Sequence, residues 1–379
     1  MDKMLKSTKI KGADVLTSSV LFTEKETIQT AIPIINIALS GDLDGGLRPG
    51  LTSIAGPSRH FKSSYALLMA SAYMKKHKDA IIIFYDSEFG SPEAYFKSFG
   101  IDVSRVLHIP ITNVEELKFD IMQKFDNKND DGIKRGDKVF ILVDSVGNLA
   151  SAREADNAIE GNSAQDMTRA KELKSLWRLV TPHLNLKNIC MIAIQHTYVE
   201  MKMYGKNIMS GGQGGMLSSD AVWIIGKSQE KDGDELVGYT FTINIEKSRY
   251  VKEKSKLEIL VKFDGGISKY TGILDLALLA GEVIKPKNAR YQLVDKASGE
   301  ILGDGPVKAD ETETEEFLGV VLKRESFKQW IRDEFKLAEG KMLADDDSEV
   351  EESFDEVPES PTKQLSKAKL AKLAKQLNE

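Results

Sequence analysis

The stretch from Gly56 to Ser64 constrains the fold of this chain more than any other. It follows a strand-like run, Leu51–Ala55, and precedes residues 66–74, where apolar side chains recur at helical spacing. A strand, a tight loop ending in Lys-Ser and a helix are the layout of a phosphate-binding loop, because backbone N–H groups and the helix N-terminus surround phosphate oxygens there. The stretch therefore predicts a nucleotide site at the edge of an α/β sheet.

Lys62 and Ser63 have the most specific predicted roles in this loop. We expect Lys62 to reach the β- and γ-phosphates of ATP and the hydroxyl of Ser63 to bind Mg²⁺. Phe61 departs from the usual pattern G-x-x-x-x-G-K-[ST], in which a second glycine tolerates unusual backbone angles and a close ligand. On the loop alone, an ordinary strand-to-helix turn is the alternative. The predicted nucleotide-binding residues of the loop are Gly56, Pro57, Ser58, Arg59, His60, Phe61, Lys62, Ser63 and Ser64.

Acidic side chains follow two further strand-like runs. Residues 80–85 lead into Asp86 and Glu88, and residues 138–143 lead into Asp144. Ligands of parallel α/β sheets bind outside the carboxyl ends of the strands, so these carboxylates should lie near the phosphates. Asp144 is expected to hold Mg²⁺ through water, and Glu88 or Asp86 to orient and deprotonate the water that attacks the γ-phosphate. The alternative for each is an acid in a solvated turn.

Strand-like and helical segments alternate up to about residue 225, which predicts an α/β fold with a mostly parallel central sheet. Strands at 239–246 and 256–263 follow with no helix between them, so we expect an antiparallel edge. The predicted divisions are an N-terminal segment at 1–30, an ATPase core at 31–283, a small C-terminal α/β region at 284–340 with a helix at 327–335, and a tail at 341–379.

The acidic charge of the chain is concentrated in its tail. Residues 341–360 hold nine acidic side chains and one basic one, a net charge of −8, whereas the whole chain carries −6. The rest of the chain therefore carries +2, and the overall acidity does not argue against an anionic partner. We expect residues 341–362 to be disordered and the Lys-rich end of the tail to form at most a marginal amphipathic helix.

Cysteine use and hydropathy favour the cytoplasm. The single cysteine, Cys190, lies in an apolar run and cannot form an internal disulfide, which fits a reducing compartment. The first eleven residues are polar and basic, unlike a secretory signal, and no apolar run approaches the roughly 20 residues of a membrane span.

Two polar segments and one basic turn are further candidates for binding. Residues 150–161 are polar and have few apolar anchors, which predicts a mobile segment. Residues 197–219 lack apolar periodicity, and structureless loops of this length are usually functional or disordered. The second contains lysines and glycines, which can neutralise and approach phosphates. Gln195 and His196 end a strand and could sense the γ-phosphate and relay its presence to the adjoining loop. Lys247 and Arg249, in a basic turn, could contact phosphate or DNA. A structural histidine and a solvated turn are the alternatives.

Several stretches carry a resemblance to a known family. They are residues 32–41, 55–58 with 61–63, 84–90 (FYDSEFG), 144–145 with 147–150, 166–171, 246–249 with 251–256, and 261–267. With them the chain resembles the RecA-type recombinases, most closely the UvsX group of T-even phages, over about residues 20–290. A phenylalanine in place of the second glycine of the phosphate loop, as at Phe61, looks like a feature of that group. The resemblance implies a RecA-like P-loop ATPase core and an N-terminal protomer-contact arm.

The resemblance also implies roles for single residues. Glu88 would activate water, Tyr95 would stack on adenine, and Asp144 would hold Mg²⁺ through water. His196 stands where many relatives have a glutamine that links the γ-phosphate to the second DNA loop. Lys247 and Arg249 would reach across a filament interface to the neighbour's ATP. Segments 150–165 and 197–219 match the single-strand-binding loops. The DNA-binding candidates are Lys202, Lys206, Gly211 and Gly212 in the second segment, and Arg169, Lys171 and Arg178 in the stretch between the two segments.

The function implied is an ATP-dependent homologous recombinase, which is a DNA-dependent ATPase with its site between protomers. It would form a filament on single-stranded DNA and exchange strands with homologous double-stranded DNA in recombination, repair and recombination-dependent replication. A recombination mediator and a single-strand-binding protein would be partners, in the host cytoplasm if the chain is phage-encoded. The alternatives are a RecA-fold hexameric helicase or motor, and an ATP-gated filament scaffold with little catalysis.

Overall fold

The computed structural model describes residues 1–10, 12–23, 26–126, 132–161, 167–199, 207–211 and 213–337. The predictions for Lys202, Lys206, Gly212 and the tail at 341–379 lie outside these residues. Within the described part of the chain, no helix combines the length and the apolar composition needed to cross a membrane.

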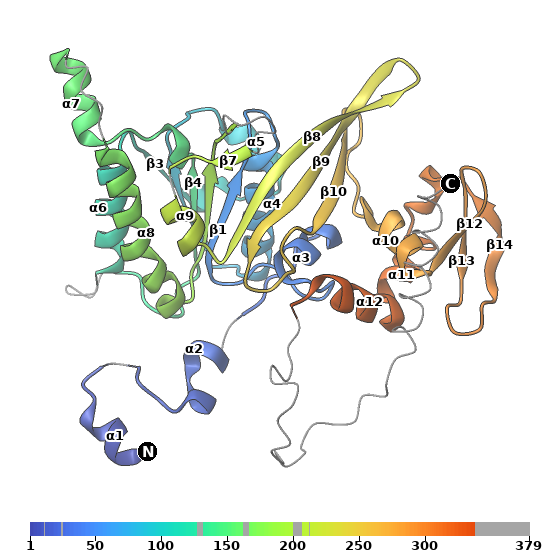
Figure 1. The fold of residues 1–379 in the computed structure, drawn as a ribbon, viewed down its shortest axis with the longest axis horizontal. Helices are drawn as coiled ribbons and strands as arrows, with labels where there is room; N and C mark the ends of the chain where they lie inside the picture. The colour runs from blue at the N-terminus through green and yellow to red at the C-terminus, as the bar shows by residue number, and fades with distance from the viewer. Residues whose placement is uncertain are drawn as a thin grey trace, which may run out of the picture. The chain divides into compact units, whose positions relative to one another are not determined.

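Among the described residues, a nine-stranded sheet forms the centre of the fold, in the order β11-β10-β9-β8-β1-β5-β4-β2-β3 (Figure 1). The strands from β8 to β3 in that order run parallel, and β9, β10 and β11 are antiparallel. This confirms the predicted α/β class and its antiparallel edge. The strands are β1 (Gly50–Ala55), β2 (Ile81–Asp86), β3 (Val106–Pro110), β4 (Val139–Asp144), β5 (Cys190–Gln195), β8 (Ala221–Asp232), β9 (Glu235–Ser248), β10 (Lys256–Lys262) and β11 (Gly266–Ile267).

Helices cover both faces of the sheet. Ile82 and Phe84 pack in the core shared with α3, α4 and α5, whereas Ile83 and Tyr85 pack in the core shared with α6 and α8. Alternate residues of one strand thus enter different cores, which explains its continuous apolar sequence. These helices are α3 (Pro33–Ser40), α4 (Lys62–Lys76), α5 (Glu93–Ser98), α6 (Val114–Phe125) and α8 (Thr168–Lys187).

Regular structure occurs within the two segments predicted as long loops. The first contains α7 (Ala152–Glu160), which begins with a capping box between Ser151 and Glu154. No residue of α7 is buried, so apolar periodicity could not indicate this helix. The second contains β6 (Thr197–Val199), β7 (Asn207–Met209) and α9 (Gln213–Ser218).

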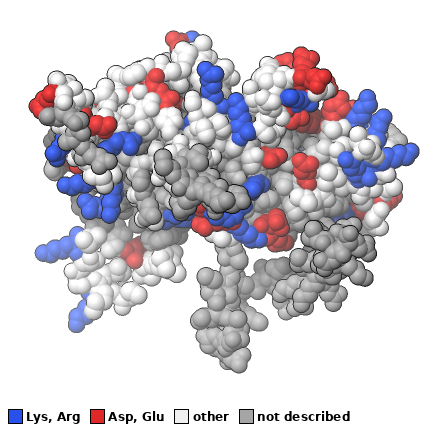
Figure 2. Space-filling model, turned by 45° about the horizontal axis from the view of Figure 1, so that its top comes forward, with Lys and Arg blue, Asp and Glu red and all other residues white. Residues whose placement is uncertain are grey.

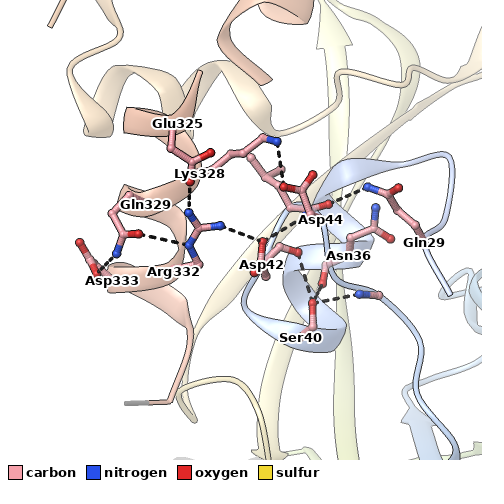
Figure 3. Close-up of polar contacts among 12 residues, drawn as sticks. Gln29, Asn36, Ser40, Asp42, Asp44, Glu325, Lys328, Gln329, Arg332 and Asp333 are labelled. Atoms are coloured by element: carbon pink, nitrogen blue, oxygen red, sulfur yellow. Dashed lines mark hydrogen bonds and ion pairs between the residues drawn. The ribbon is translucent and has the colours of Figure 1, made fainter. Parts of the chain in front are cut away.

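The small C-terminal α/β region follows α10 (Ile273–Ala280). It consists of an antiparallel sheet and two helices, and its domain boundaries remain predictions. The helix α12 contacts the turn after α3: Lys328 Nζ lies 2.8 Å from Asp44 Oδ2, and Arg332 lies 3.7 Å from Asp42 Oδ1 (Figure 3). The remaining elements are α1 (Asp2–Ser7), α2 (Val20–Thr23), β12 (Val283–Lys287), β13 (Arg290–Val294), β14 (Ile301–Val307), α11 (Leu318–Lys323) and α12 (Glu325–Phe335).

Candidate nucleotide site and DNA-binding loops

A cavity of about 280 Å³ lies at the carboxyl ends of the parallel strands. Most of the predicted nucleotide site meets there. The cavity is lined by Ser58, Arg59, His60, Phe61, Lys62, Ser63, Ser64, Glu88, Tyr95, Asp144, His196 and Phe241.

Lys62 is the buried cation that lines this cavity, whereas Arg59, which also lines it, is exposed. Lys62 is buried at the first position of α4, and its Nζ donates a hydrogen bond to the carbonyl oxygen of Pro57 at 2.8 Å. Burial lowers the pKa of Lys62, and the negative charges of Glu88 and Asp144 oppose that shift. The ammonium group is therefore held over the loop, in an environment where an added anion would stabilise its charge.

Phe61 has the backbone conformation that usually favours glycine. Its φ is 60°, and Arg59 also has a φ of 60°. The left-handed region costs an L-residue about 1–2 kcal/mol. The ring of Phe61 stacks on Phe241 of β9 with 5.0 Å between centroids and meets Tyr65 of α4 edge-on at 5.4 Å. Such pairs contribute about 0.5–1.5 kcal/mol each, so packing offsets the strain of the missing glycine.

Phe241 was not among the residues predicted for the site. The signal was the pair of aromatic side chains at positions 239 and 241 of one strand, because alternate residues of a strand lie on the same face. What the sequence could not indicate was that this face would lie against the phosphate loop.

Ser63 and Asp144 form the candidate Mg²⁺ site. Ser63 Oγ donates a hydrogen bond to Asp144 Oδ2 at 2.7 Å, and Asp144 Oδ1 is buried with no hydrogen-bond partner among the described residues. Burial raises the pKa of Asp144 to about 6, and the charges of Glu88 and Asp86 act in the same direction. An unpartnered carboxylate oxygen beside a hydroxyl fits Mg²⁺ that takes its other ligands from phosphates and water.

Glu88 and His196 form a second polar pair in the cavity. His196 Nε2 lies 3.0 Å from Glu88 Oε1 and 3.4 Å from Ser145 Oγ. The hydrogen bond from His196 is the largest effect that lowers the pKa of Glu88, which falls to about 2; a hydrogen bond from Ser145 and the charge of Lys62 add to it. Glu88 is therefore ionised and able to orient a water molecule at neutral pH.

Asp86, the other carboxylate predicted to activate water, stabilises the turn after β2 instead. Its Oδ1 accepts hydrogen bonds from the backbone N–H groups of Glu88 at 3.0 Å and Phe89 at 2.7 Å. Its Oδ2 lies 3.1 Å from His108 Nε2 on β3. Phe89 has a φ of 54°, so these hydrogen bonds hold a turn that its backbone alone would not favour. The geometry thus leaves Glu88, and not Asp86, facing the cavity.

Tyr95 lies where a base could bind beside the phosphates. Its hydroxyl forms a hydrogen bond with that of Ser64, and burial raises the pKa of the Tyr95 phenol. Tyr95 and Phe61 also line a larger cavity of about 750 Å³ that continues to Val261 and Ile267. A mostly apolar recess next to a phosphate loop suits a nucleobase.

Lys247 and Arg249 do not line the loop cavity. Lys247 Nζ donates to three carbonyl oxygens at the C-terminal end of α9, at distances between 2.7 and 3.1 Å. Arg249 Nε lies 2.9 Å from Asp220 Oδ1, and Asp220 Oδ2 accepts from the backbone N–H of Leu51 at 2.9 Å. Leu51 is at the start of β1, whereas the phosphate loop follows its end at Ala55. The two cations therefore lie away from the chain's own phosphate loop.

Arg169 supports the first loop segment. It donates from Nε to the carbonyl oxygen of Leu149 at 2.6 Å and from an η nitrogen to that of Gly147 at 2.9 Å. These bonds engage its guanidinium with the backbone just before α7. As a DNA-binding candidate it is therefore less available than the exposed Lys171 and Arg178 of α8.

The second loop segment packs on α8 through small residues. Gly211 has a φ of 87°, and a Cβ there would lie 2.9 Å from Leu173 Cδ1. A Cβ on Gly215 would lie 3.0 Å from Trp177 Nε1.

Lys and Arg side chains lie on both flanks of the face shown in Figure 2, with acidic side chains among them. The positive charge on this face is thus divided among several groups of side chains.

Comparison with known proteins places the chain among recombination proteins. It is 45% identical over 358 residues to the Recombination and repair protein of Enterobacteria phage T4, covering 94% of this chain and 89% of that protein. It is 24% identical over 303 residues to Protein RecA of Allorhizobium ampelinum, covering 77% and 79% of the two chains. It is 24% identical over 289 residues to DNA repair protein recA homolog 1, chloroplastic, of Arabidopsis thaliana, covering 75% of this chain and 61% of that protein.

The family model described as Bacteriophage T4, Recombination and repair protein, C-terminal domain, matches residues 270–331. These residues include α10 and, after it, the sheet β12–β14 and α11 of the small C-terminal region. With its core similar to RecA proteins and 94% of its length similar to the phage T4 protein, the chain belongs to the family of the phage T4 recombination and repair protein, among the RecA-type recombinases.

Proposed function

We propose that this recombinase binds ATP and Mg²⁺ at the phosphate loop, forms a helical filament on single-stranded DNA and exchanges strands with homologous double-stranded DNA. Its roles would be recombination, repair and recombination-dependent replication. The observation that carries the proposal is the convergence of the Lys62 ammonium, the unpartnered oxygen of Asp144 and the ionised Glu88 at one end of the parallel strands.

In this proposal the loop amides and Lys62 bind the phosphates, while Ser63 and Asp144 hold Mg²⁺. The metal ion would neutralise developing phosphate charge. Glu88 would orient the attacking water and accept its proton. His196 now donates to Glu88; a γ-phosphate would compete for that donor and release the carboxylate for water. His196 would thereby report the γ-phosphate to the adjoining segment at 197–219.

Lys247 and Arg249 would serve the nucleotide of a neighbouring protomer. Their separation from the chain's own phosphate loop supports this role, because a head-to-tail assembly can bring the far end of one sheet to the loop of the next chain. ATP would then bridge protomers and favour the DNA-bound filament, and hydrolysis would loosen it.

The testing experiment measures ATP hydrolysis with and without single-stranded DNA, in the wild type and in Lys62→Ala. We expect strong stimulation by DNA in the wild type and loss of turnover in the variant. Turnover indifferent to DNA would overturn the proposal. Strand exchange without directional unwinding would then separate a recombinase from a hexameric motor.

A recombination mediator and a single-strand-binding protein would assist loading, and the site of action would be the host cytoplasm. The division into segments 1–30, 31–283, 284–340 and 341–379 would separate the protomer-contact arm, the ATPase core, the small C-terminal region and the acidic tail. Limited proteolysis with identification of the cleavage sites would test that division.

A further inference from the structure

We propose that the β8–β9 hairpin positions the phosphate loop through Lys227, Tyr239 and Phe241. The inference rests on the proposed function, because it assigns positioning residues to the same nucleotide site. Its starting point is the loop itself, in which Arg59 and Phe61 both have left-handed backbone angles without being glycine. Such a conformation persists when surrounding contacts determine it.

Contacts from the hairpin reach both strained residues. Phe241 of β9 stacks on the ring of Phe61, with 5.0 Å between centroids and 23° between planes. Lys227 of β8 places its Nζ 3.5 Å from the carbonyl oxygen of Arg59. Each non-glycine residue of the loop with a left-handed backbone is thus met by a side chain from the hairpin.

Lys227 is itself held by aromatic rings. Its Nζ lies 3.6 Å from the centroid of Tyr239 and 5.9 Å from that of Phe241. A cation over an aromatic face is attracted by the ring quadrupole, which restricts an otherwise flexible lysine. Because Lys227 and Phe241 are also paired across β8 and β9, the cation, the rings and the loop form one continuous cluster.

This arrangement gives the hairpin a role in ATP affinity. The side chains proposed to act on the γ-phosphate, the attacking water and Mg²⁺ are those of Lys62, Glu88 and Asp144, and none of them contacts Lys227 or Phe241 among the hydrogen bonds and ring contacts of the described residues. Removing a hairpin contact should therefore disorder the loop before ATP binds and raise KM, with little change in kcat once ATP is bound.

The first experiment compares Lys227→Met with Lys231→Met, which removes the same charge further along β8. Binding of a fluorescent ATP analogue is measured without DNA, and KM and kcat with saturating single-stranded DNA. We expect Lys227→Met to weaken binding of the analogue and to raise KM for ATP, each about threefold to fivefold. Lys231→Met should change neither quantity, and Lys227→Arg should restore binding. Equal behaviour of the two Met variants would overturn the proposal.

A double-mutant cycle tests the positioning role itself. Phe61→Gly removes the ring but lets the loop adopt its angles without strain. Phe241→Leu should then weaken analogue binding severalfold in the wild type and hardly at all in the Phe61→Gly background. The same penalty in both backgrounds would contradict the inference. Failure of DNA-dependent turnover in the wild type would instead refute the proposed function, and the analogue measurement without DNA would still test the hairpin.

Discussion

The carboxylates of Asp144 and Glu88 have opposite pKa shifts, although both line the same cavity. Burial raises the pKa of Asp144 to about 6, whereas the hydrogen bond from His196 lowers the pKa of Glu88 to about 2. Ionised Glu88 therefore stabilises the fold above its unfolded pKa, and this contribution is lost as the pH falls toward 2. Ionised Asp144 has the opposite effect in the metal-free chain.

Asp144→Asn should stabilise the metal-free protein at neutral pH. Between about pH 4 and pH 6 the folded chain is protonated at Asp144 to a greater extent than the unfolded chain. The free energy of unfolding of the wild type therefore decreases as the pH rises through that window. We expect the free energy of unfolding of the variant to exceed that of the wild type by about 1–3 kcal/mol near pH 7.5 and by less near pH 5. Thermal unfolding in EDTA at both values checks this, and a gain that does not depend on pH would contradict it.

Glu88→Gln should lower kcat by about 10²- to 10⁴-fold, since a general base contributes that much, while ATP affinity changes little. Steady-state turnover and analogue binding measure the two effects separately. Glu93→Gln, an exposed carboxylate at the start of α5, is the matched control. Unchanged turnover in Glu88→Gln would favour the scaffold alternative over catalysis.

At the scale of elements, α7 depends on its cap more than on packing. None of its residues is buried, and Ser151 Oγ accepts a hydrogen bond from the Glu154 N–H at 3.0 Å. Ser151→Ala should destabilise the helix by about 1 kcal/mol and speed amide exchange over residues 152–160 severalfold. Hydrogen exchange read by mass spectrometry checks this; unchanged protection in α7 would show that other contacts hold it.

The sequence predicted those elements whose signal is local and strong. Continuous apolar runs indicated β2, β4 and β5, and the Lys-Ser pair indicated the start of α4. It missed α7, because a helix with no buried face has no apolar period, although the pattern Ser151-x-x-Glu154 was present. It could not predict that Phe241 would contact the phosphate loop or that Asp220 would bind the backbone at the start of β1, because both contacts depend on tertiary packing.

The attachment of α12 depends on Gly41. Its φ is 71°, and a Cβ there would lie 2.6 Å from the backbone of Lys336, just after α12. Gly281 has a φ of 78° with open space around it. Both alanines would be strained by the positive φ, but only the one at position 41 must also displace the backbone of Lys336. Gly41→Ala should therefore destabilise the protein by about 1–3 kcal/mol more than Gly281→Ala. Urea unfolding of the two variants measures the difference, and equal losses would refute the packing argument.

At the scale of the whole molecule, the proposed sharing of the ATP site between protomers would make two inactive variants complementary. Lys62→Ala lacks the loop cation, and Lys247→Ala lacks the cation offered to a neighbour. If they co-assemble at random, about one interface in four combines both intact halves in a head-to-tail filament. We expect an equimolar mixture to recover about that share of wild-type ATP turnover. A mixture as inactive as either variant would place Lys247 within its own chain's site or outside catalysis.

The position of Lys247 has a consequence for how assembly starts. In the single chain its ammonium is already occupied by three carbonyl oxygens at the end of α9. If Lys247 bridges protomers as proposed, a free protomer would hold this cation in its own fold, and joining a filament would exchange the carbonyl oxygens for phosphate oxygens. Lone chains would stay inert toward ATP, and initiation would be slower than growth. Each new junction would release the end of α9, which lies within the segment proposed as the second DNA-binding loop.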